Sequence, residues 1–359
     1  MRIRIIDKFI IKKFLSSYLF VVGILLAVIG VIQITEKNDK IIKNDLSFME
    51  VATYMLDFFP YVGNMITPIT TFIAVVFITA KMAGHSEIIA LLSSGISFRR
   101  LMISYLMGAL IIAVINFLFT GWIIPNSNKD RIAFEIQYFE NPYHFSDRDV
   151  HLKISPTSYF YLESYNDQSK SGFKCTLETI EDHELKEKLY AQRIEWQDST
   201  ESWLLKKWQR RKFDGFIEEF SRGPTLDTVL NITPSDFEND WRLFETLTIT
   251  ELNQHIKTLK SRGADNVVVY EVEKYMRYTS PLTVVLLTFI GLFVSARKAR
   301  GGTGFQIALG FLISFIYILF FWFSKTFAET GGVHPALAMW IPNLIFSAIG
   351  FLLYKTVPR

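Results

Sequence analysis

The residue types that usually carry out catalysis occur in this 359-residue chain without the spacings that catalysis needs. No Gly-x-x-x-x-Gly-Lys-Ser/Thr loop is present, and the dipeptide Gly-Lys never occurs, so the usual phosphate cradle for ATP is missing. The stretch HELKE (183–187) lacks the second histidine of a zinc-protease helix, and no Gly-x-Ser-x-Gly motif occurs. Six scattered histidines and the single Cys175 make no metal-ligand cluster. We therefore predict that the chain is not an enzyme and holds no cofactor or metal of its own.

A different kind of site is indicated by the stretch HSEIIALLSSGIS (85–97), which combines one carboxylate with a short apolar stripe. Ser86 can cap a helix over 86–95, Glu87 suits its positive end, and Gly95 can terminate it. Three apolar residues at helical spacing share one face of this helix, with Ile89 beside them: Ile88, Leu91 and Leu92. Such a helix either lies on the membrane surface as a turn or inserts into a groove of a partner, with Glu87 available for an ion pair.

The elements around this stretch are expected to be membrane spans. Half of the residues are hydrophobic, yet a fifth are charged, and the charges are unevenly distributed. Uncharged segments of 18 to 25 residues occur six times, each long enough as a helix to cross about 30 Å of hydrocarbon. These segments are 14–34, 58–80, 101–125, 279–296, 303–324 and 335–354. Buried helices of a soluble core would not repeat this pattern six times, so the sequence predicts a polytopic membrane protein. Residues 1–13 fit either a short interfacial helix before the first span or a simple basic flank.

The basic residues of the short connections indicate the orientation of these spans. The side of the N-terminus carries many of them: Arg2, Arg4, Lys8, Lys12, Lys13, Lys81, Arg99, Arg100, Arg297, Lys298, Arg300, Lys355 and Arg359. The opposite side carries few: Lys37, Lys40, Lys43 and Lys325. Because cytoplasmic loops hold the excess of lysine and arginine, both termini are expected in the cytoplasm. The first span lacks a following small-residue cleavage site and is expected to be an uncleaved anchor.

The long connection 126–270 is then expected outside, between transmembrane parts 1–125 and 271–359. Six stretches in it are rich in β-branched or aromatic residues and contain alternation: 150–154, 159–165, 173–180, 188–196, 202–208 and 225–232. Consecutive short strands of this kind predict a sandwich, jelly roll or barrel, which the single cysteine leaves without an internal disulfide. A helix follows at about 248–262, where Thr248 and Glu251 fit a capping box and Gly263 a left-handed stop.

Polar residues near the spans suggest packing contacts. Asn64, Asn116 and Asn343 are expected to form hydrogen bonds between helices, and Asp57 to lie at the outer interface. Further along, the Glu273–Arg277 spacing suits a weak ion pair on a helix surface. The predicted segments contain no ionisable group, which argues against an ion-coupled carrier.

Proline also occurs inside two predicted spans. Pro68 and Pro342 predict either a static kink or a flexing gate in spans two and six.

Four elements in order carry a resemblance to a known family: IDKFIIKKFL at the start, SEIIALLSSGIS in the second connection, TITELNQHIKTLKSRG, and VEKYMRYTSPL before the fourth span. HPALAMWIPNLIF in the last span adds to them. With six spans and an outside β domain, the chain resembles the LptF/LptG permeases of the lipopolysaccharide-export ABC transporter, slightly more the LptG member. The resemblance covers almost the whole chain and implies a bacterial inner-membrane protein with a periplasmic jelly-roll-like domain.

The resemblance also implies partners and site residues. Two related six-span chains would pair around a lipid cavity, with ATP and magnesium bound by a separate cytoplasmic ABC ATPase dimer and the lipid passed to a periplasmic bridge protein. By this likeness Glu87 makes the polar contact with the ATPase, with Ile88, Leu91 and Leu92 packing beside it. Lys37, Lys40 and Arg131 would face the phosphates of the lipopolysaccharide. Gln33 stands where some members are basic.

Other interpretations stay open at this point. The basic residues fit ordinary interfacial charge, and Glu36, Asp39 and Asp45 in the same stretch bring its local net charge close to zero. The chain as a whole fits an ion-coupled or passive lipid transporter without an ATPase, or a non-transporting anchor for a periplasmic β domain. No basic run resembles a nucleic-acid footprint.

Overall fold

The computed structural model describes residues 4–139, 148–166, 169–181, 183–215, 217–230, 232–234, 242–262, 264, 266–296 and 302–357. The described chain forms two compact units, one of helices and one built around a sheet. The predicted helix stop Gly263 lies outside the described residues. So do five of the basic residues used to predict the orientation: Arg2, Arg297, Lys298, Arg300 and Arg359.

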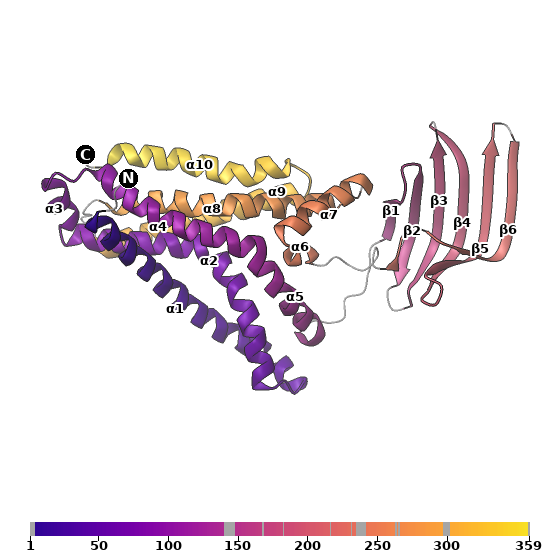
Figure 1. The fold of residues 1–359 in the computed structure, drawn as a ribbon, viewed down its shortest axis with the longest axis horizontal. Helices are drawn as coiled ribbons and strands as arrows, with labels where there is room; N and C mark the ends of the chain where they lie inside the picture. The colour runs from indigo at the N-terminus through magenta and orange to yellow at the C-terminus, as the bar shows by residue number, and fades with distance from the viewer. Residues whose placement is uncertain are drawn as a thin grey trace. The chain divides into compact units, whose positions relative to one another are not determined.

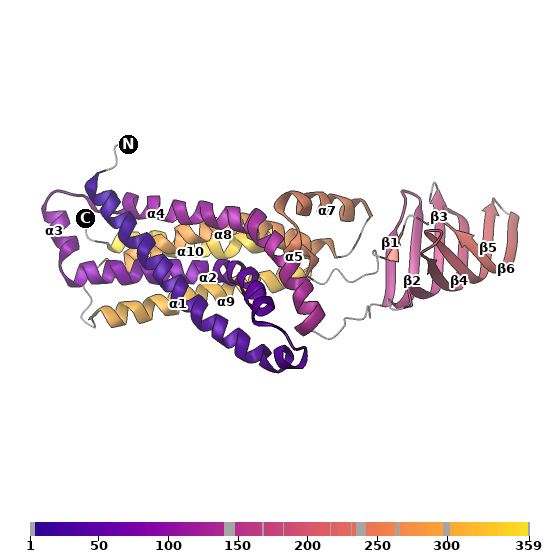
Figure 2. The same cartoon turned by 60° about the horizontal axis from the view of Figure 1, so that its bottom comes forward.

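Within the described ranges, six helices of the first unit are long and apolar enough to cross a membrane, which confirms the predicted helical membrane domain. Five of them are single helices: α1 (Ile5–Lys43), α2 (Phe48–Gly84), α8 (Val267–Ser295), α9 (Gly302–Glu329) and α10 (Pro335–Thr356). The third in chain order is a continuous run of four segments: α4 (Phe98–Leu118), η1 (Phe119–Ile123), α5 (Ile124–Phe134) and η2 (Glu135–Phe139). Short helices are α3 (Glu87–Ser93), α6 (Leu243–Thr246) and α7 (Ile249–Arg262). Within the helical unit, α3 and both ends of the described chain lie at one end, and α5 and α6 lie toward the other (Figures 1 and 2).

The expected separate interfacial helix at the N-terminus is wrong. α1 runs without a break over 39 residues, a length of about 58 Å, so it exceeds the roughly 30 Å hydrocarbon core. Its only buried residues are Asp7, Ile10, Phe14 and Gly30. The first three follow helical spacing, so α1 is attached to the unit along a narrow stripe near its start.

The predicted ends of the outside connection fall inside helices. The third helical run continues past residue 125 to Phe139, and α8 begins at Val267, before residue 271. Pro125 does not end this run because it directly follows the π-helical turn η1, and local π adjustments of this kind let a membrane helix accommodate a proline. Two π-helical turns, η1 and η2, flank α5, and such turns are often found at functional sites.

The helix α7 begins with the predicted capping box. Glu251 Oε2 accepts hydrogen bonds from the backbone N–H of Thr248 at 2.7 Å and from its hydroxyl at 2.8 Å. Both bonds lower the pKa of the Glu251 carboxyl, and the bond from the backbone N–H has the larger effect. The box therefore satisfies backbone donors that a helix start otherwise leaves without partners.

The sheet unit confirms the predicted β domain, with longer strands than expected. The strands are β1 (Arg148–Lys153), β2 (Ser158–Asn166), β3 (Ser171–Glu181), β4 (Glu184–Gln197), β5 (Ser202–Asp214) and β6 (Ile217–Thr228). They pair in sequence order, all antiparallel, with Leu162 opposite Cys175 and Cys175 opposite Ala191. The sheet is thus a meander, without the strand crossover of a closed jelly roll among the described strands. The last strand begins at Ile217, earlier than the predicted residue 225. The prediction missed this start because charged residues and a glycine interrupt the alternation of apolar and polar residues there.

One face of the sheet carries the apolar core of this unit. Trp203 is fully buried there, and its indole N–H donates to the carbonyl of Ile232 at 2.8 Å. Cys175 lies in the same core, where burial raises the pKa of its thiol to about 12. The thiol is therefore an apolar packing group rather than a nucleophile.

Candidate functional site

A cavity of about 460 Å³ opens in the helical unit, between α2, η1, α5, α6, α8 and α9. Its volume lies in the range of ligand-binding pockets. Much of the wall is apolar and comes from helices that cross the membrane: Ile66, Ile69, Ile124, Met276, Phe321 and Trp322. Polar side chains from several helices also face it, so the cavity combines apolar surface with placed polar groups.

Two amide clusters hold the helices around this cavity together. Asn116 Nδ2 donates to Asn64 Oδ1 at 2.6 Å, and Ser280 Oγ donates to Asn116 Oδ1 at 3.0 Å, which joins α2, α4 and α8. Asn343 Oδ1 accepts from Thr283 Oγ1 and from the Tyr317 hydroxyl, each at 3.1 Å, and joins α8, α9 and α10. The predicted hydrogen bonds of Asn64, Asn116 and Asn343 are therefore confirmed.

A buried arginine on α5 organises the polar end of the cavity. The side chain of Arg131 is 2 % exposed. Its Nη1 donates to Glu135 Oε1 at 3.0 Å and its Nη2 to Glu245 Oε2 at 2.8 Å. The ring of Tyr61 lies 4.1 Å from its Cζ atom. Two carboxylates and an aromatic face compensate the desolvation of the guanidinium, as a buried cation requires.

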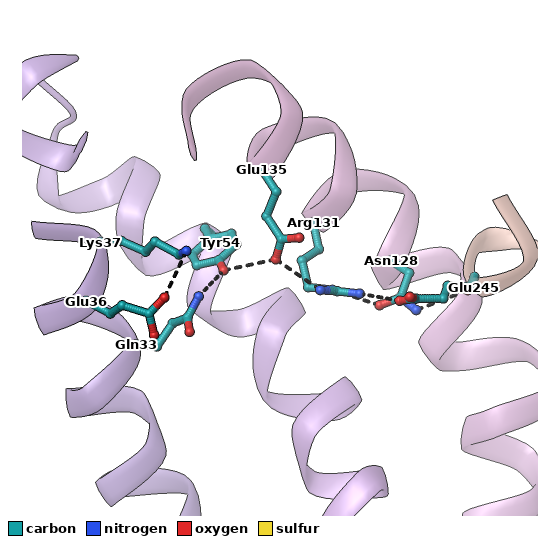
Figure 3. Close-up of polar contacts among 8 residues, drawn as sticks. All are labelled: Gln33, Glu36, Lys37, Tyr54, Asn128, Arg131, Glu135 and Glu245. Carbon is teal, nitrogen blue, oxygen red and sulfur yellow. Dashed lines mark hydrogen bonds and ion pairs between the residues drawn. The ribbon is translucent and has the colours of Figure 1, made fainter. Parts of the chain in front are cut away.

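The contacts of Arg131 belong to a longer chain of polar side chains (Figure 3). Gln33 Nε2 on α1 donates to the Tyr54 hydroxyl on α2 at 2.9 Å, and that hydroxyl donates to Glu135 Oε1 at 3.1 Å. Asn128 continues the chain on the other side: its Oδ1 accepts from Arg131 Nε at 2.9 Å, and its Nδ2 donates to the Glu245 carbonyl at 3.0 Å. A continuous path of hydrogen bonds thus joins α1, α2, η2, α5 and α6.

A second buried arginine, on α8, holds the same short helix α6. Arg277 is 1 % exposed, and its Nε donates to Glu273 Oε1 at 2.7 Å. Its two terminal nitrogens donate to the carbonyls of Leu247 at 2.6 Å and Phe244 at 2.8 Å. The prediction of a weak Glu273–Arg277 surface pair is wrong, because α8 turns this face toward the cavity and α6 rather than toward water.

The three residues predicted to bind lipid phosphate have different surroundings. Arg131 is fully engaged inside the protein. Lys37 lies 3.1 Å from Glu36 on its own helix, with about a quarter of its side chain exposed. Lys40 donates to the carbonyl of Phe139 in η2. Lys37 and Lys40 therefore extend from the C-terminal part of α1, whereas Arg131 anchors helices.

The helix α3 lies at the opposite end of the unit, near the described start of α1 (Figure 2). Its predicted stop is confirmed: Gly95 has φ +81°, and the N–H groups of Gly95 and Ile96 donate to the carbonyls of Leu92 and Leu91, each at 3.1 Å. The predicted Ser86 cap is wrong. Ser86 is left-handed, with φ 59° and no side-chain cap, because it makes the tight turn out of α2 and lacks the extended backbone of a capping residue.

The apolar stripe of α3 faces its own chain. Ile88 is 3 % exposed, and Leu91 and Leu92 pack against the same core cluster. The outward side instead presents Ile89, which is 56 % exposed, beside exposed Ala90 and Ser93. Glu87 stays 42 % exposed, with Lys13 of α1 at 3.8 Å.

Sequence reasoning missed Glu245, Glu273, Arg277 and Tyr54 as parts of one site. The Glu273–Arg277 spacing was visible, but its burial was not, because the uncharged segments ended short of the helices that contain them. Glu245 had no signal of its own, since it reaches Arg131 across 114 positions of sequence. Among the residues that the structure describes, no group of three or more His, Cys, Asp or Glu is placed to hold a metal ion.

Comparison with known proteins agrees with these features. The profile of the family "Lipopolysaccharide export system permease LptF/LptG" matches residues 8–356. The chain is similar to the lipopolysaccharide export system permease protein LptG of Escherichia coli strain K12, with 17 % identity over 352 residues and 97 % of each chain covered. The LptG protein of E. coli O6:H1 strain CFT073 is similar to the same extent. The chain belongs to the LptF/LptG family of lipopolysaccharide export permeases, which are transporter components rather than enzymes.

Proposed function

We propose that this LptF/LptG family member is the permease subunit of an ATP-driven exporter that takes lipopolysaccharide from the outer leaflet of the inner membrane. The observation that carries the proposal is the cavity between α2, α5, α8 and α9 in a chain whose family profile matches nearly end to end. Exposing one long acyl chain to water costs on the order of 10 kcal/mol, at about 0.8 kcal/mol per CH₂. An apolar conduit and an external source of energy are therefore both needed.

The size of the cavity supports pairing with a second six-span chain. A volume of about 460 Å³ suits one ligand of moderate size. A lipid with several acyl chains needs more room, which two such chains facing one another would supply. In the proposed assembly both termini and α3 lie in the cytoplasm, and the connection with the sheet lies in the periplasm and passes lipid to a bridge protein.

For the lipid headgroup we propose Lys37 and Lys40 as the phosphate-facing cations, since both extend from the outer part of α1. Arg131 takes a supporting role, because its donors are committed to Asn128, Glu135 and Glu245. Exchanging Lys37 and Lys40 for glutamine is expected to weaken lipid binding without unfolding the chain, whereas Arg131→Gln is expected to destabilise it.

For the ATPase contact we propose the outward side of α3. Glu87 keeps the role of polar contact, and Ile89 with Ala90 takes the apolar role predicted for Ile88, Leu91 and Leu92. ATP and magnesium would be bound by the partner, consistent with a sequence that lacks the phosphate loop.

The deciding experiment is a tagged purification in mild detergent, with mass spectrometry and an ATPase assay. Wild type is expected to bring down an ABC ATPase and a second six-span chain. Glu87→Arg and Ile89→Asp are expected to lose the ATPase, while the control Lys12→Gln, an exposed change on α1, keeps it. A wild type that purifies alone, or lipid movement that is independent of nucleotide, would instead favour an ion-coupled or passive transporter. A chain that moves no lipid would favour the non-transporting anchor.

A further inference from the structure

A carboxylate at the start of α1 is fully buried next to the α3 helix. Asp7 has no exposed surface, and its Oδ1 accepts from Ser104 Oγ at 2.7 Å. Its Oδ2 accepts from the backbone N–H of Arg4 at 2.7 Å and forms an ion pair with Arg100. Arg100 and Ser104 belong to α4, just after the α3 turn. One side chain therefore both caps α1 and attaches it to α4.

Apolar packing joins α3 to the same corner. Ile6 and Ile10 of α1 line a nearly filled space together with Ile88, Leu91 and Leu92 of α3, and Arg100 and Ser104 border it. Lys13 and Glu87 make a second, more exposed contact between α1 and α3 at 3.8 Å. The first turns of α1, the helix α3 and the start of α4 thus share one core with a buried ion pair at its edge.

Farther along, α1 is attached to α2 by half-buried and polar contacts, among them the Tyr18 hydroxyl with Thr67 Oγ1 at 3.1 Å and Gln33 with Tyr54 at 2.9 Å. After Asp7, Ile10 and Phe14, the only other buried residue of α1 is Gly30. Phe14 packs directly on Gly108 of α4, where an added Cβ atom would lie 2.5 Å from the ring. The buried side chains of α1 are therefore concentrated where α3 and α4 meet it.

We propose that Asp7 is a positioning residue that locks the start of α1 to the α3–α4 corner, so that displacement of α3 by a docked partner moves α1 with it. The proposal rests on the proposed function, in which α3 meets the ATPase. In this proposal the movement of α3 is transmitted to α1 through the buried carboxylate of Asp7, which has no surface open to a partner or to lipid. α1 then receives the movement directly from the corner instead of only through α2.

The first test uses the reconstituted exporter with its ATPase, measuring ATP hydrolysis and lipopolysaccharide release in parallel. In Asp7→Asn and Arg100→Gln, lipid released per ATP is expected to fall about tenfold, as expected for loss of a buried charge-assisted hydrogen bond, with the ATPase still bound. Arg100→Lys keeps the charge and is expected to retain most of the coupling. Lys12→Gln on the exposed side of α1 is the matched control. Wild-type coupling in Asp7→Asn and Arg100→Gln would overturn the proposal.

A second test is independent of how well these variants fold. A short thiol cross-link between Ile6→Cys and Leu91→Cys ties α1 to α3 and is expected to leave lipid release unchanged, because the two already move together. A cross-link between Leu26→Cys and Gly63→Cys ties α1 to α2 and is expected to stop release; a Cβ atom added at Gly63 would lie 3.7 Å from Leu26 Cδ1. The opposite result for either pair overturns the proposal. A wild-type complex without ATP-driven release would refute the proposed function itself.

Discussion

Removing the guanidinium of Arg277 is expected to destabilise the helical unit more than removing an exposed charged group would. Arg277→Met leaves Glu273, only 7 % exposed, without the cation at 2.7 Å, and removes the donors of two carbonyl groups. Breaking a buried pair by removing one partner costs about 3–5 kcal/mol. Because Glu273 itself borders the cavity, its carboxylate has space beside it for solvation, and we expect the lower end, about 3 kcal/mol.

The assay is thermal unfolding in detergent, followed by tryptophan fluorescence and by aggregation. A loss of about 3 kcal/mol lowers the Tm by roughly 10 °C for a unit of this size. The double variant Glu273→Leu/Arg277→Met removes both charges and is expected to regain about 2 kcal/mol relative to Arg277→Met.

The control for this prediction is Lys325→Met, which breaks a 3.6 Å pair with Glu329 at the same helical spacing but with more exposure. It is expected to cost below about 1 kcal/mol. Our reasoning would be refuted by an Arg277→Met chain as stable as wild type, or by a double variant less stable than the single one.

Three further outcomes are expected. The pKa of Glu251 is lowered by hydrogen bonds from Thr248, so its contribution to α7 is complete above the ordinary glutamate pKa of about 4.3 and is lost as pH falls through the lower folded value. The protection of α7 amides, taken as the intrinsic exchange rate divided by the observed rate at each pH, should therefore fall below pH ~4, and Glu251→Gln should remove that loss of protection. Because burial raises the pKa of the Cys175 thiol to about 12, maleimide at pH 8 should label it only when the sheet opens, so labelling should follow denaturant unfolding of that unit. Gly108→Ala should cost about 1–3 kcal/mol, because its methyl group would lie 2.5 Å from Phe14.

Each of these has a clear contrary result. Protection of the α7 amides that stays constant through this pH range would show that ionised Glu251 contributes nothing to the helix. Rapid labelling of Cys175 in the folded chain would show that the sheet core is open. For Gly108, the matched change is Gly23→Ala on α1, which has nothing within 4 Å of the added Cβ atom. If both alanine variants behave alike, Phe14 adapts and the close packing of α1 on α4 is not important.

The fold was predictable where a pattern depends on composition over many residues. Uncharged segments of 18 or more residues identify the spans, because no other environment tolerates so many of them. The capping box at Thr248 and the glycine stop at Gly95 were also readable, since both depend on residues within one or two helical turns.

The candidate site was less predictable because its contacts connect distant parts of the chain. Arg131 is seen in the sequence as one more interfacial cation, and only the approach of Glu245 and Tyr61 makes it an anchor. The orientation of α3 could not be inferred either. Its apolar stripe was recognised correctly, but such a stripe can pack against the chain's own core as well as against a partner. In this structure it packs against α1.

The sparse burial of α1 has a consequence for biosynthesis. Only 6 % of its most apolar stretch is buried inside the chain, against 56 % for the corresponding stretches of α2 and α8. A helix that satisfies its backbone internally and needs few neighbours is stable in lipid as soon as it has been inserted. α1 can therefore remain in the bilayer with few protein contacts while the ribosome completes the chain. α2 and α8, in contrast, acquire their packing only after later helices have been inserted.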